Sequence, residues 1–280
     1  MCGIIGFTGN LQAPGILVDG LQQLEYRGYD SAGIAVNNGS ETQIVKTTGK
    51  VATLREKVAA TAGLEGTCGI GHTRWATHGG VTEVNAHPHV SGNVTLIHNG
   101  IIENYKELAA SLKTKGYTAI SETDTEVIPN LIDYYYEKDT KDDDKRVLRA
   151  VVSACSDLKG SFALEIISSF LPEKMIVVRK DSPLVIGTTS TENYISSDIP
   201  AILSYTKDFY LLNDYEYVVL SKNKAEFFDS NLKPIKKDLV NIDWNASAAE
   251  KDGYPDFMLK EIHEQPKSIR ETIGSRLTSD

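Results

Sequence analysis

The sequence predicts an α+β fold in which sheets and helices form separate layers. Many short β-branched runs bounded by glycine are interleaved with fewer, longer segments that have apolar residues at three-to-four spacing. Strands, then helices, then strands again are typical of layered α+β domains. With 280 residues and 41% apolar composition, the chain can bury one large core or two modest ones.

Strands are predicted where a short β-branched run is bounded by turn-forming residues. In the first half of the chain these runs are residues 3–7, 32–36, 43–46, 68–73 and 94–98. In the second half they are residues 162–167, 175–178, 184–186, 194–196, 209–212, 217–220 and 226–228.

Helices are predicted over residues 14–24, 51–62, 104–115, 123–136 and 147–155, where apolar residues recur at helical spacing. Ser121-Glu122-Thr123-Asp124 followed by Glu126 resembles a capping box, which would place Asp124 at or near a helix N-terminus. The charged run 137–145 is predicted to be a solvated loop between two of these helices.

A change of pattern near residue 241 predicts a domain boundary. Residues 241–254 lose their periodicity, and a helical pattern resumes at 255–262. We therefore expect one domain over residues 1–240, followed over residues 241–280 by a linker and the start of an inter-domain segment.

Composition excludes several classes of partner. A formal net charge of -9 argues against a nucleic-acid partner. No apolar run approaches the roughly 18 residues that cross a bilayer, and no secretion signal opens the chain. The cysteines, Cys2, Cys68 and Cys155, are odd in number and far apart, which argues against a disulfide framework. We expect a cytoplasmic protein without a membrane partner.

Cys2 is the most informative residue of the chain. Removal of Met1 would give Cys2 a free α-amine beside its thiol, so that one residue would supply both a nucleophile and its base. An α-amine has a pKa of about 8 and a thiol a pKa of about 8.5, so the amine can accept the thiol proton. The alternative interpretation is that Cys2 is a small apolar residue that begins a buried strand.

Two polar segments beside predicted strands form the candidate site. Residues 71–79 place Arg74, Trp75 and His78 where a strand gives way to a loop. Asn99 and Gly100 follow another predicted strand, and they can offer a side-chain amide and a close backbone N–H as an oxyanion hole. An ordinary tight turn is the alternative interpretation of Asn99-Gly100.

Histidines are frequent in this region, but their spacing does not predict a metal site. His72, His78, His87 and His89 match no zinc motif, and Pro88 prevents His87 and His89 from sharing one helix face. A Gly-rich nucleotide-binding loop is also missing. We expect no metal and no cofactor, and histidines that are structural or shape a substrate pocket.

Several motifs, in their order and spacing, resemble the glutamine amidotransferases of the N-terminal-nucleophile hydrolase superfamily. These motifs are Cys2-Gly3-Ile4-Ile5-Gly6 and the segments 24–33, 72–79 and 85–89. Segments 98–104, 121–126 and 182–187 narrow the resemblance to the glutaminase half of glucosamine-6-phosphate synthases, over about residues 2–240. The resemblance implies a four-layer α/β/β/α sandwich of two mostly antiparallel sheets.

The resemblance also implies a role for each matched residue. Cys2 would attack the side-chain amide of L-glutamine, form a thioester and release ammonia, with its α-amine as the base. Asn99 and Gly100 would stabilise the oxyanions, Arg74 would bind the substrate carboxylate and Asp124 its ammonium group. The remaining residues would organise the nucleophile or shape the pocket: Arg27, Trp75, Thr77, His78 and His87. A packing role explains His87 equally well.

The resemblance further implies a longer protein, in which a sugar-isomerase half joins the ammonia to fructose 6-phosphate. We expect the 280-residue chain alone to hydrolyse glutamine as a monomer, and the full-length protein to be a homodimer. Two alternatives stay open. One is the glutaminase domain of an amidophosphoribosyltransferase, which shares Cys2-Gly3-Ile4 and Asp30-Ser31-Ala32-Gly33. The other is a glutamine-sensing module without catalysis.

Overall fold

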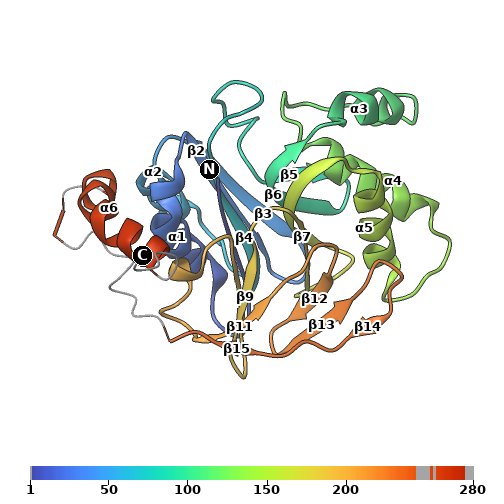
Figure 1. Ribbon diagram of the computed structural model, residues 1–280. Coiled ribbons are helices and arrows are strands. Elements are labelled where there is room, and N and C mark those ends of the chain that lie inside the picture. The colour runs from blue at the N-terminus through green and yellow to red at the C-terminus, as the bar shows by residue number, and fades with distance from the viewer. Residues whose placement is uncertain (1, 244–252, 255–256, 275–280) are drawn as a thin grey trace. The chain divides into compact units, whose positions relative to one another are not determined.

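A computed structural model describes residues 2–243, 253–254 and 257–274 of the chain (Figure 1). The chain divides into two compact units, Met1–Ile242 and Asp243–Asp280. Most of the linker predicted over residues 241–254 lies outside the described residues. In the second unit, the helix predicted from residue 255 is described as α6 (Phe257–Gly274).

The first sheet has eight strands, and its adjacent strands are antiparallel. They are β1 (Gly3–Thr8), β2 (Ser31–Asn37), β3 (Thr42–Thr48), β4 (Cys68–Arg74), β9 (Val185–Thr188), β10 (Asn193–Ser196), β11 (Asp208–Leu211) and β15 (Val240–Asn241). In the order β15-β11-β9-β10-β1-β4-β2-β3, strand β1 lies between β10 and β4. The chain therefore places Cys2 directly before an interior strand.

The second sheet has seven strands, which are also antiparallel to their neighbours. They are β5 (His89–Ser91), β6 (Val94–Ile102), β7 (Gly160–Ser168), β8 (Met175–Lys180), β12 (Tyr217–Ser221), β13 (Lys224–Phe228) and β14 (Pro234–Ile235), in the order β14-β13-β12-β8-β7-β6-β5.

Helices cover the outer face of each sheet (Figure 1). The first sheet carries α1 (Ala13–Leu24) and α2 (Val51–Ala60), and the second carries α4 (Val127–Lys138) and α5 (Arg146–Asp157), with α3 (Tyr105–Lys113) beside α4. The short 3₁₀ helices are η1 (Glu25–Arg27) and η2 (Ile199–Ala201).

The side chains of β1 show how the layers are built. Successive side chains of a strand point to opposite faces. Ile5 and Phe7 accordingly pack in the cluster under α1, whereas Ile4 packs with Ile97 and Val177 between the two sheets. A third apolar cluster joins the second sheet to α4 and α5. These three layers of contact confirm the predicted α/β/β/α sandwich.

The capping box predicted at residues 121–126 is wrong. The helix begins at Val127, three residues after Asp124, and its N-cap residue has no side-chain cap bond. Glu126 instead accepts the N–H groups of Ile120 (2.8 Å) and Ser121 (2.5 Å). The Thr123 hydroxyl lies 3.2 Å from His89 Nε2, so it bonds across the fold rather than to the helix.

The alternative interpretation of Asn99-Gly100 as a tight turn is also wrong. Strand β6 continues to Ile102, and Asn99 pairs with Ala163 and Gly100 with Phe162. Gly100 has a φ of +140°, and a Cβ there would lie 2.0 Å from the Ser161 carbonyl oxygen. Glycine is therefore required because the neighbouring strand approaches closely.

Candidate active site

Cys2 is held by hydrogen bonds at the start of β1. The Gly3 N–H donates to Thr73 Oγ at 3.1 Å, and the Ile4 N–H donates to Ser197 Oγ at 3.1 Å. Thr73 belongs to β4, and Ser197 directly follows β10. Both neighbouring strands thus fix the position of the residue that precedes β1.

The thiol of Cys2 lies against the backbone of Trp75. The Trp75 N–H donates to Cys2 Sγ at 3.2 Å, and Sγ lies 3.7 Å from the Trp75 carbonyl oxygen. Burial raises the pKa of the Cys2 thiol, and the Trp75 N–H opposes that shift only in part. The neutral thiol is therefore the resting form, and attack on a substrate requires a base.

The carbonyl oxygen of Cys2 accepts two side-chain donors. Asn99 Nδ2 lies at 3.1 Å and Arg27 Nε at 3.3 Å. Arg27 also forms an ion pair with Asp198 at 3.1 Å, and Asp198 accepts the hydroxyl of Tyr26. Arg27 and Asn99 therefore approach Cys2 from two separate parts of the chain.

Arg74 folds the loop that follows β4. Its Nη1 donates to the Gly80 carbonyl at 3.0 Å, and its Nη2 donates to the carbonyls of His78 and, at 3.3 Å, of Gly79. The Gly80 N–H donates in turn to Glu122 at 3.0 Å. The guanidinium group is buried, so it supplies a positive charge to the pocket while it fixes residues 78–80.

Asp124 supplies the opposite charge. One carboxylate oxygen accepts the Ile102 N–H at 2.8 Å, and the other lies 3.8 Å from His78 Nδ1. The Asp124 side chain is only 7% exposed. A carboxylate with one oxygen bonded to the backbone and the other directed toward a side chain of the pocket wall can accept a cation.

These groups meet in one small pocket, which we call the Cys2 pocket. It is lined by Cys2, Arg74, Trp75, Thr77, His78, His87, His98, Gly100, Thr123, Asp124 and Thr125. Its cavity of about 20 Å³ holds about one water molecule. A larger molecule can enter only if part of the wall moves.

Trp75 is an exposed part of that wall, with 56% of its surface accessible. Its ring packs over Gly28, where a Cβ would lie 2.1 Å from the indole. Gly28 has a φ of +123°, so both its conformation and this contact require glycine. Trp75 therefore packs directly against the backbone of the segment that contains Gly28.

The structure brings all ten predicted site residues together. Eight of them line the Cys2 pocket, and the other two, Asn99 and Arg27, bond the Cys2 carbonyl. Sequence analysis did not single out His98, Thr123 or Thr125, which line the same pocket. The Thr125 hydroxyl bridges His87 Nε2 (3.1 Å) and His98 Nδ1 (2.9 Å), and only the fold brings these residues together.

Four buried histidines, His72, His87, His89 and His98, form what we call the histidine cluster. Burial lowers the pKa of each, so all four imidazoles are neutral near pH 7. The rings of His72 and His87 stack at 4.0 Å, and His87 meets His89 edge-on at 4.7 Å. Within the described part of the chain, no group of three His, Cys, Asp or Glu residues is arranged to hold a metal ion.

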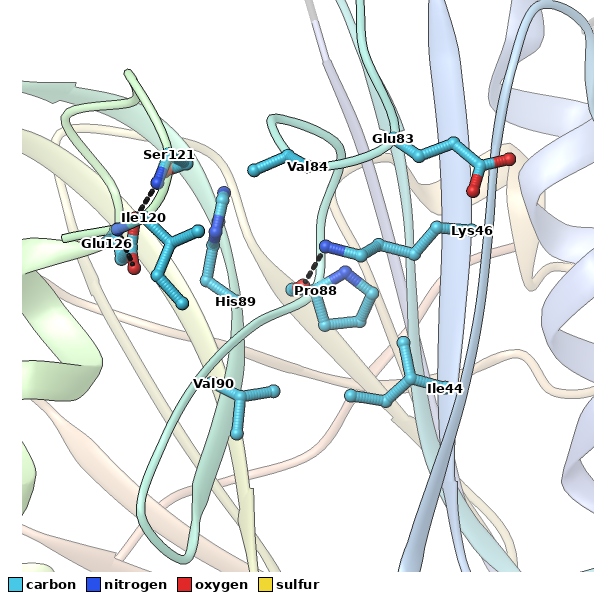
Figure 2. Close-up of a pocket in the computed structure, with 10 residues that line it drawn as sticks. All are labelled: Ile44, Lys46, Glu83, Val84, Pro88, His89, Val90, Ile120, Ser121 and Glu126. Carbon is cyan, nitrogen blue, oxygen red and sulfur yellow. Dashed lines mark hydrogen bonds between the residues drawn. The ribbon is translucent and has the colours of Figure 1, made fainter.

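A second cavity, of about 350 Å³, lies at the edge of the two sheets (Figure 2). Figure 2 shows Ile44 and Lys46 of β3 facing His89 and Val90 of β5 across it. Lys46 Nζ donates to the carbonyls of Ala86 (2.7 Å) and Pro88 (3.0 Å). This edge cavity is larger than the Cys2 pocket, but no cysteine lines it.

Comparisons with known proteins agree with this fold and site. Residues 72–204 match the family described as "Glutamine amidotransferase domain". The glutamine–fructose-6-phosphate aminotransferase (isomerizing) of Clostridium acetobutylicum is 50% identical over 99% of this chain, and that of Clostridium perfringens is 50% identical over 100%. The chain spans 45% of the length of each of these relatives.

Among solved structures, a glutamine phosphoribosylpyrophosphate amidotransferase from B. subtilis, complexed with ADP and GMP, superposes with a TM-score of 0.69. It shares 24% identity, and the match covers 83% of this chain and 50% of that chain. This likeness establishes the shared fold.

The sandwich fold is shared with a solved glutamine phosphoribosylpyrophosphate amidotransferase, and the sequence match is to the glutamine amidotransferase domain, so fold and sequence indicate the same class of protein. Residues 72–204 of the chain therefore contain a glutamine amidotransferase domain, and over nearly its whole length the chain is similar to the glutamine–fructose-6-phosphate aminotransferases named above. Among the described residues, no helix combines the length and apolar composition that crossing a bilayer requires.

Proposed function

We propose that this chain hydrolyses L-glutamine to glutamate and ammonia through a thioester on Cys2. The observation that carries the proposal is that the Cys2 pocket contains a thiol, the guanidinium of Arg74 and the carboxylate of Asp124. A thiol attacks an amide carbon, and a fixed pair of opposite charges matches the α-carboxylate and α-ammonium of a free amino acid. Glutamine carries all three of the groups that this pocket can address.

The reaction begins with the removal of Met1, which frees the α-amine of Cys2. The amine accepts the thiol proton, and the sulfur attacks the side-chain carbonyl carbon of glutamine. The amine returns the proton to the leaving nitrogen, so that ammonia departs and a γ-glutamyl thioester remains. Water, deprotonated by the same amine, then hydrolyses the thioester to glutamate.

Each addition step places negative charge on the former carbonyl oxygen. Asn99 has two N–H groups on Nδ2, of which one donates to the Cys2 carbonyl at 3.1 Å. We assign the other N–H, together with the backbone N–H of Gly100, to this oxyanion. Preorganised donors of this kind each contribute about 3 to 4 kcal/mol to the transition state.

The remaining residues are proposed to bind and enclose the substrate. Arg74 is assigned to the α-carboxylate and Asp124 to the α-ammonium group. Trp75, Thr77 and His78 shape the wall of the pocket, and Arg27 organises Cys2 through its bond to the Cys2 carbonyl. For His87, the stacking contact with His72 supports a packing role as well as a place in the wall.

Labelling with an electrophilic glutamine analogue tests the nucleophile. We expect one equivalent of the analogue to attach to Cys2. The mass of the labelled chain should also show that Met1 has been removed. Cys68 and Cys155 serve as internal controls, because both are fully buried and burial raises the pKa of each to about 12. Glutaminase activity should disappear in Cys2→Ala. Undiminished turnover in that variant, or turnover by a chain that retains Met1, would contradict the mechanism.

The fate of the ammonia is a separate proposal. The relatives named above carry fructose 6-phosphate in their names, and this chain spans 45% of their length. We infer that this chain is part of a longer cytoplasmic protein, a homodimer, which transfers the ammonia to fructose 6-phosphate. The full-length protein should form glucosamine 6-phosphate from glutamine, whereas the 280-residue chain should release free ammonia and sediment as a monomer.

A further inference from the structure

We propose that His72 is a positioning residue that fixes the orientation of the Asn99 amide, so that the amide presents its N–H groups toward Cys2. This proposal rests on the proposed function, because it concerns the oxyanion donor of the same reaction. It assigns a role to a buried histidine that lies outside the set of expected site residues.

The contacts of His72 determine which ring nitrogen carries the proton. His72 Nε2 lies 3.0 Å from the His98 carbonyl oxygen and 3.0 Å from Asn99 Oδ1. A backbone carbonyl oxygen can only accept a hydrogen bond, so Nε2 must be the protonated nitrogen. The single N–H is then shared between the two oxygens.

That proton also determines which way the Asn99 amide faces. With Oδ1 toward His72, the amide accepts from the imidazole, and Nδ2 points to the Cys2 carbonyl at 3.1 Å. The rotated amide would place an N–H group against the N–H of His72 and an oxygen against the oxygen of Cys2. Both contacts would be repulsive, so His72 stabilises the orientation in which Asn99 Nδ2 faces Cys2.

Apart from Asn99 and the His98 carbonyl, which share the N–H of Nε2, the His72 side chain has no other hydrogen-bond partner in the described part of the chain. The residue is fully buried, and Nδ1 has no hydrogen-bond partner among the described residues. Burial lowers the pKa of His72 to about 3, so the ring remains neutral and keeps one N–H. A neutral imidazole can direct the amide without adding a charge beside the nucleophile.

A pure packing role is the competing explanation, because the His72 ring stacks on His87 at 4.0 Å. The variant His72→Phe separates the two roles, since it keeps an aromatic ring against His87 but removes the N–H donor. His72→Gln restores a donor near the position of Nε2, and His72→Asn carries the same amide on a shorter side chain that does not reach Asn99.

We expect His72→Phe to lower kcat for glutamine roughly 10-fold to 100-fold with little change in KM, because the oxyanion exists only in the transition state and intermediates. His72→Gln should recover most of this loss, and His72→Asn should not. Alkylation of Cys2 by iodoacetamide forms no oxyanion, so its rate should be the same in all of these variants.

His89→Phe is the matched control. His89 belongs to the same cluster and is 4% exposed, but it bonds Thr123 and lines the edge cavity shown in Figure 2. This variant should lose a similar thermal stability while its kcat stays within about threefold of the unchanged chain. If kcat falls in proportion to the loss of thermal stability in the variants at His72 and at His89 alike, the proposal is overturned.

A double-variant cycle tests whether His72 acts through Asn99. If it does, His72→Phe should have almost no further effect on kcat in a chain that already carries Asn99→Ala. If the effects of the two substitutions on kcat multiply fully, the proposal is wrong. If His72→Phe does not fold, equal kcat values in His72→Gln and His72→Asn would overturn the proposal instead. Failure of the unchanged chain to hydrolyse glutamine would instead contradict the proposed function itself.

Discussion

Arg74 and Asp124 contribute opposite charges to the Cys2 pocket, yet the backbone already binds both side chains. Arg74 donates to the carbonyls of residues 78–80, and Asp124 accepts the Ile102 N–H. These bonds hold the two charges in place before a ligand arrives. Preorganisation of this kind lowers the entropy cost of binding, so it favours recognition of a small amino acid.

Asp124→Asn isolates the charge of Asp124 from its structural bond. The amide oxygen can still accept the Ile102 N–H, so the fold should be retained. Loss of a charge-assisted bond to the substrate ammonium should raise KM for glutamine roughly 10-fold to 100-fold. Steady-state kinetics with glutamine measure this change.

Glutaramate, which lacks the α-amine of glutamine, provides the control substrate. Glutaramate hydrolysis should be slow, and its rate should be nearly equal in the unchanged chain and in Asp124→Asn, because this substrate has no ammonium group for residue 124 to bind. A KM for glutamine unaffected by Asp124→Asn would remove Asp124 from the binding site.

At the scale of single residues, the sequence identified the candidate site residues better than the residues that hydrogen-bond to them. Cys2, Arg74 and Asn99 stand in recognisable motifs, and the structure places them in contact with one another or with the same pocket. His72 and Thr125 lie 53 residues apart in the sequence. The bonds of His72 to Asn99 and of Thr125 to His98 depend on how the two sheets pack. Local spacing contains no information about such contacts.

Strand β7 contains a polar residue in the middle of the sandwich. Glu165 is fully buried, and both of its carboxyl oxygens have no hydrogen-bond partner in the described part of the chain. Its side chain occupies the space opposite Gly6, where a Cβ would lie 2.3 Å from Glu165 Oε2. Burial raises the pKa of Glu165 well above its ordinary value, so the neutral acid is favoured in the folded state.

This burial makes stability depend on pH. Because the pKa in the folded state exceeds the unfolded value of about 4.3, the unfolded state gains more from ionisation as pH rises. The contribution of Glu165 to stability is therefore complete below that value, and it is lost as pH rises toward the folded-state pKa. Above pH of about 5, Glu165 should progressively destabilise the fold.

Glu165→Met should raise the free energy of unfolding by about 1 to 4 kcal/mol near pH 7, since an apolar side chain of similar volume replaces a buried acid. The gain should grow over the interval above about pH 5, as measured by urea unfolding. Glu165→Gln is the control, because it removes the titration but leaves an unpartnered amide. An equal gain at every pH would mean that Glu165 does not titrate over this interval.

The strands and helices themselves were largely predictable, although the short strands β5, β14 and β15 were missed, and the other errors fall at the ends of elements. The predicted strand ending at His98 extends to Ile102, because β7 pairs with it through Gly100 and beyond. The helix predicted from Thr123 starts at Val127, because residues 123–125 bond to the histidine cluster and β6. In both places pairing with a distant part of the chain overrides the local signal.

Across the whole molecule, the first unit contains complete apolar layers of its own. Its three apolar clusters are formed by residues up to Ile242, which lies in the cluster between the first sheet and its helices. The predicted boundary at residue 240 differs from this division by two residues. A test of the boundary therefore compares chains with and without Asn241 and Ile242.

A chain of residues 1–242 should fold and retain glutaminase activity, because it keeps the three apolar clusters and the Cys2 pocket. A chain of residues 1–240 loses the bond from Ile242 N–H to the Lys207 carbonyl (2.8 Å), the bond from Asn241 to Asp208 (2.8 Å) and a buried isoleucine. The chain of residues 1–240 should be less stable by about 2 to 4 kcal/mol.

Urea unfolding of the two chains, with glutamine turnover as the second readout, measures the difference. Equal stability of the two would place the boundary before β15, whereas an unfolded 1–242 chain would show that the first unit requires residues 243–280.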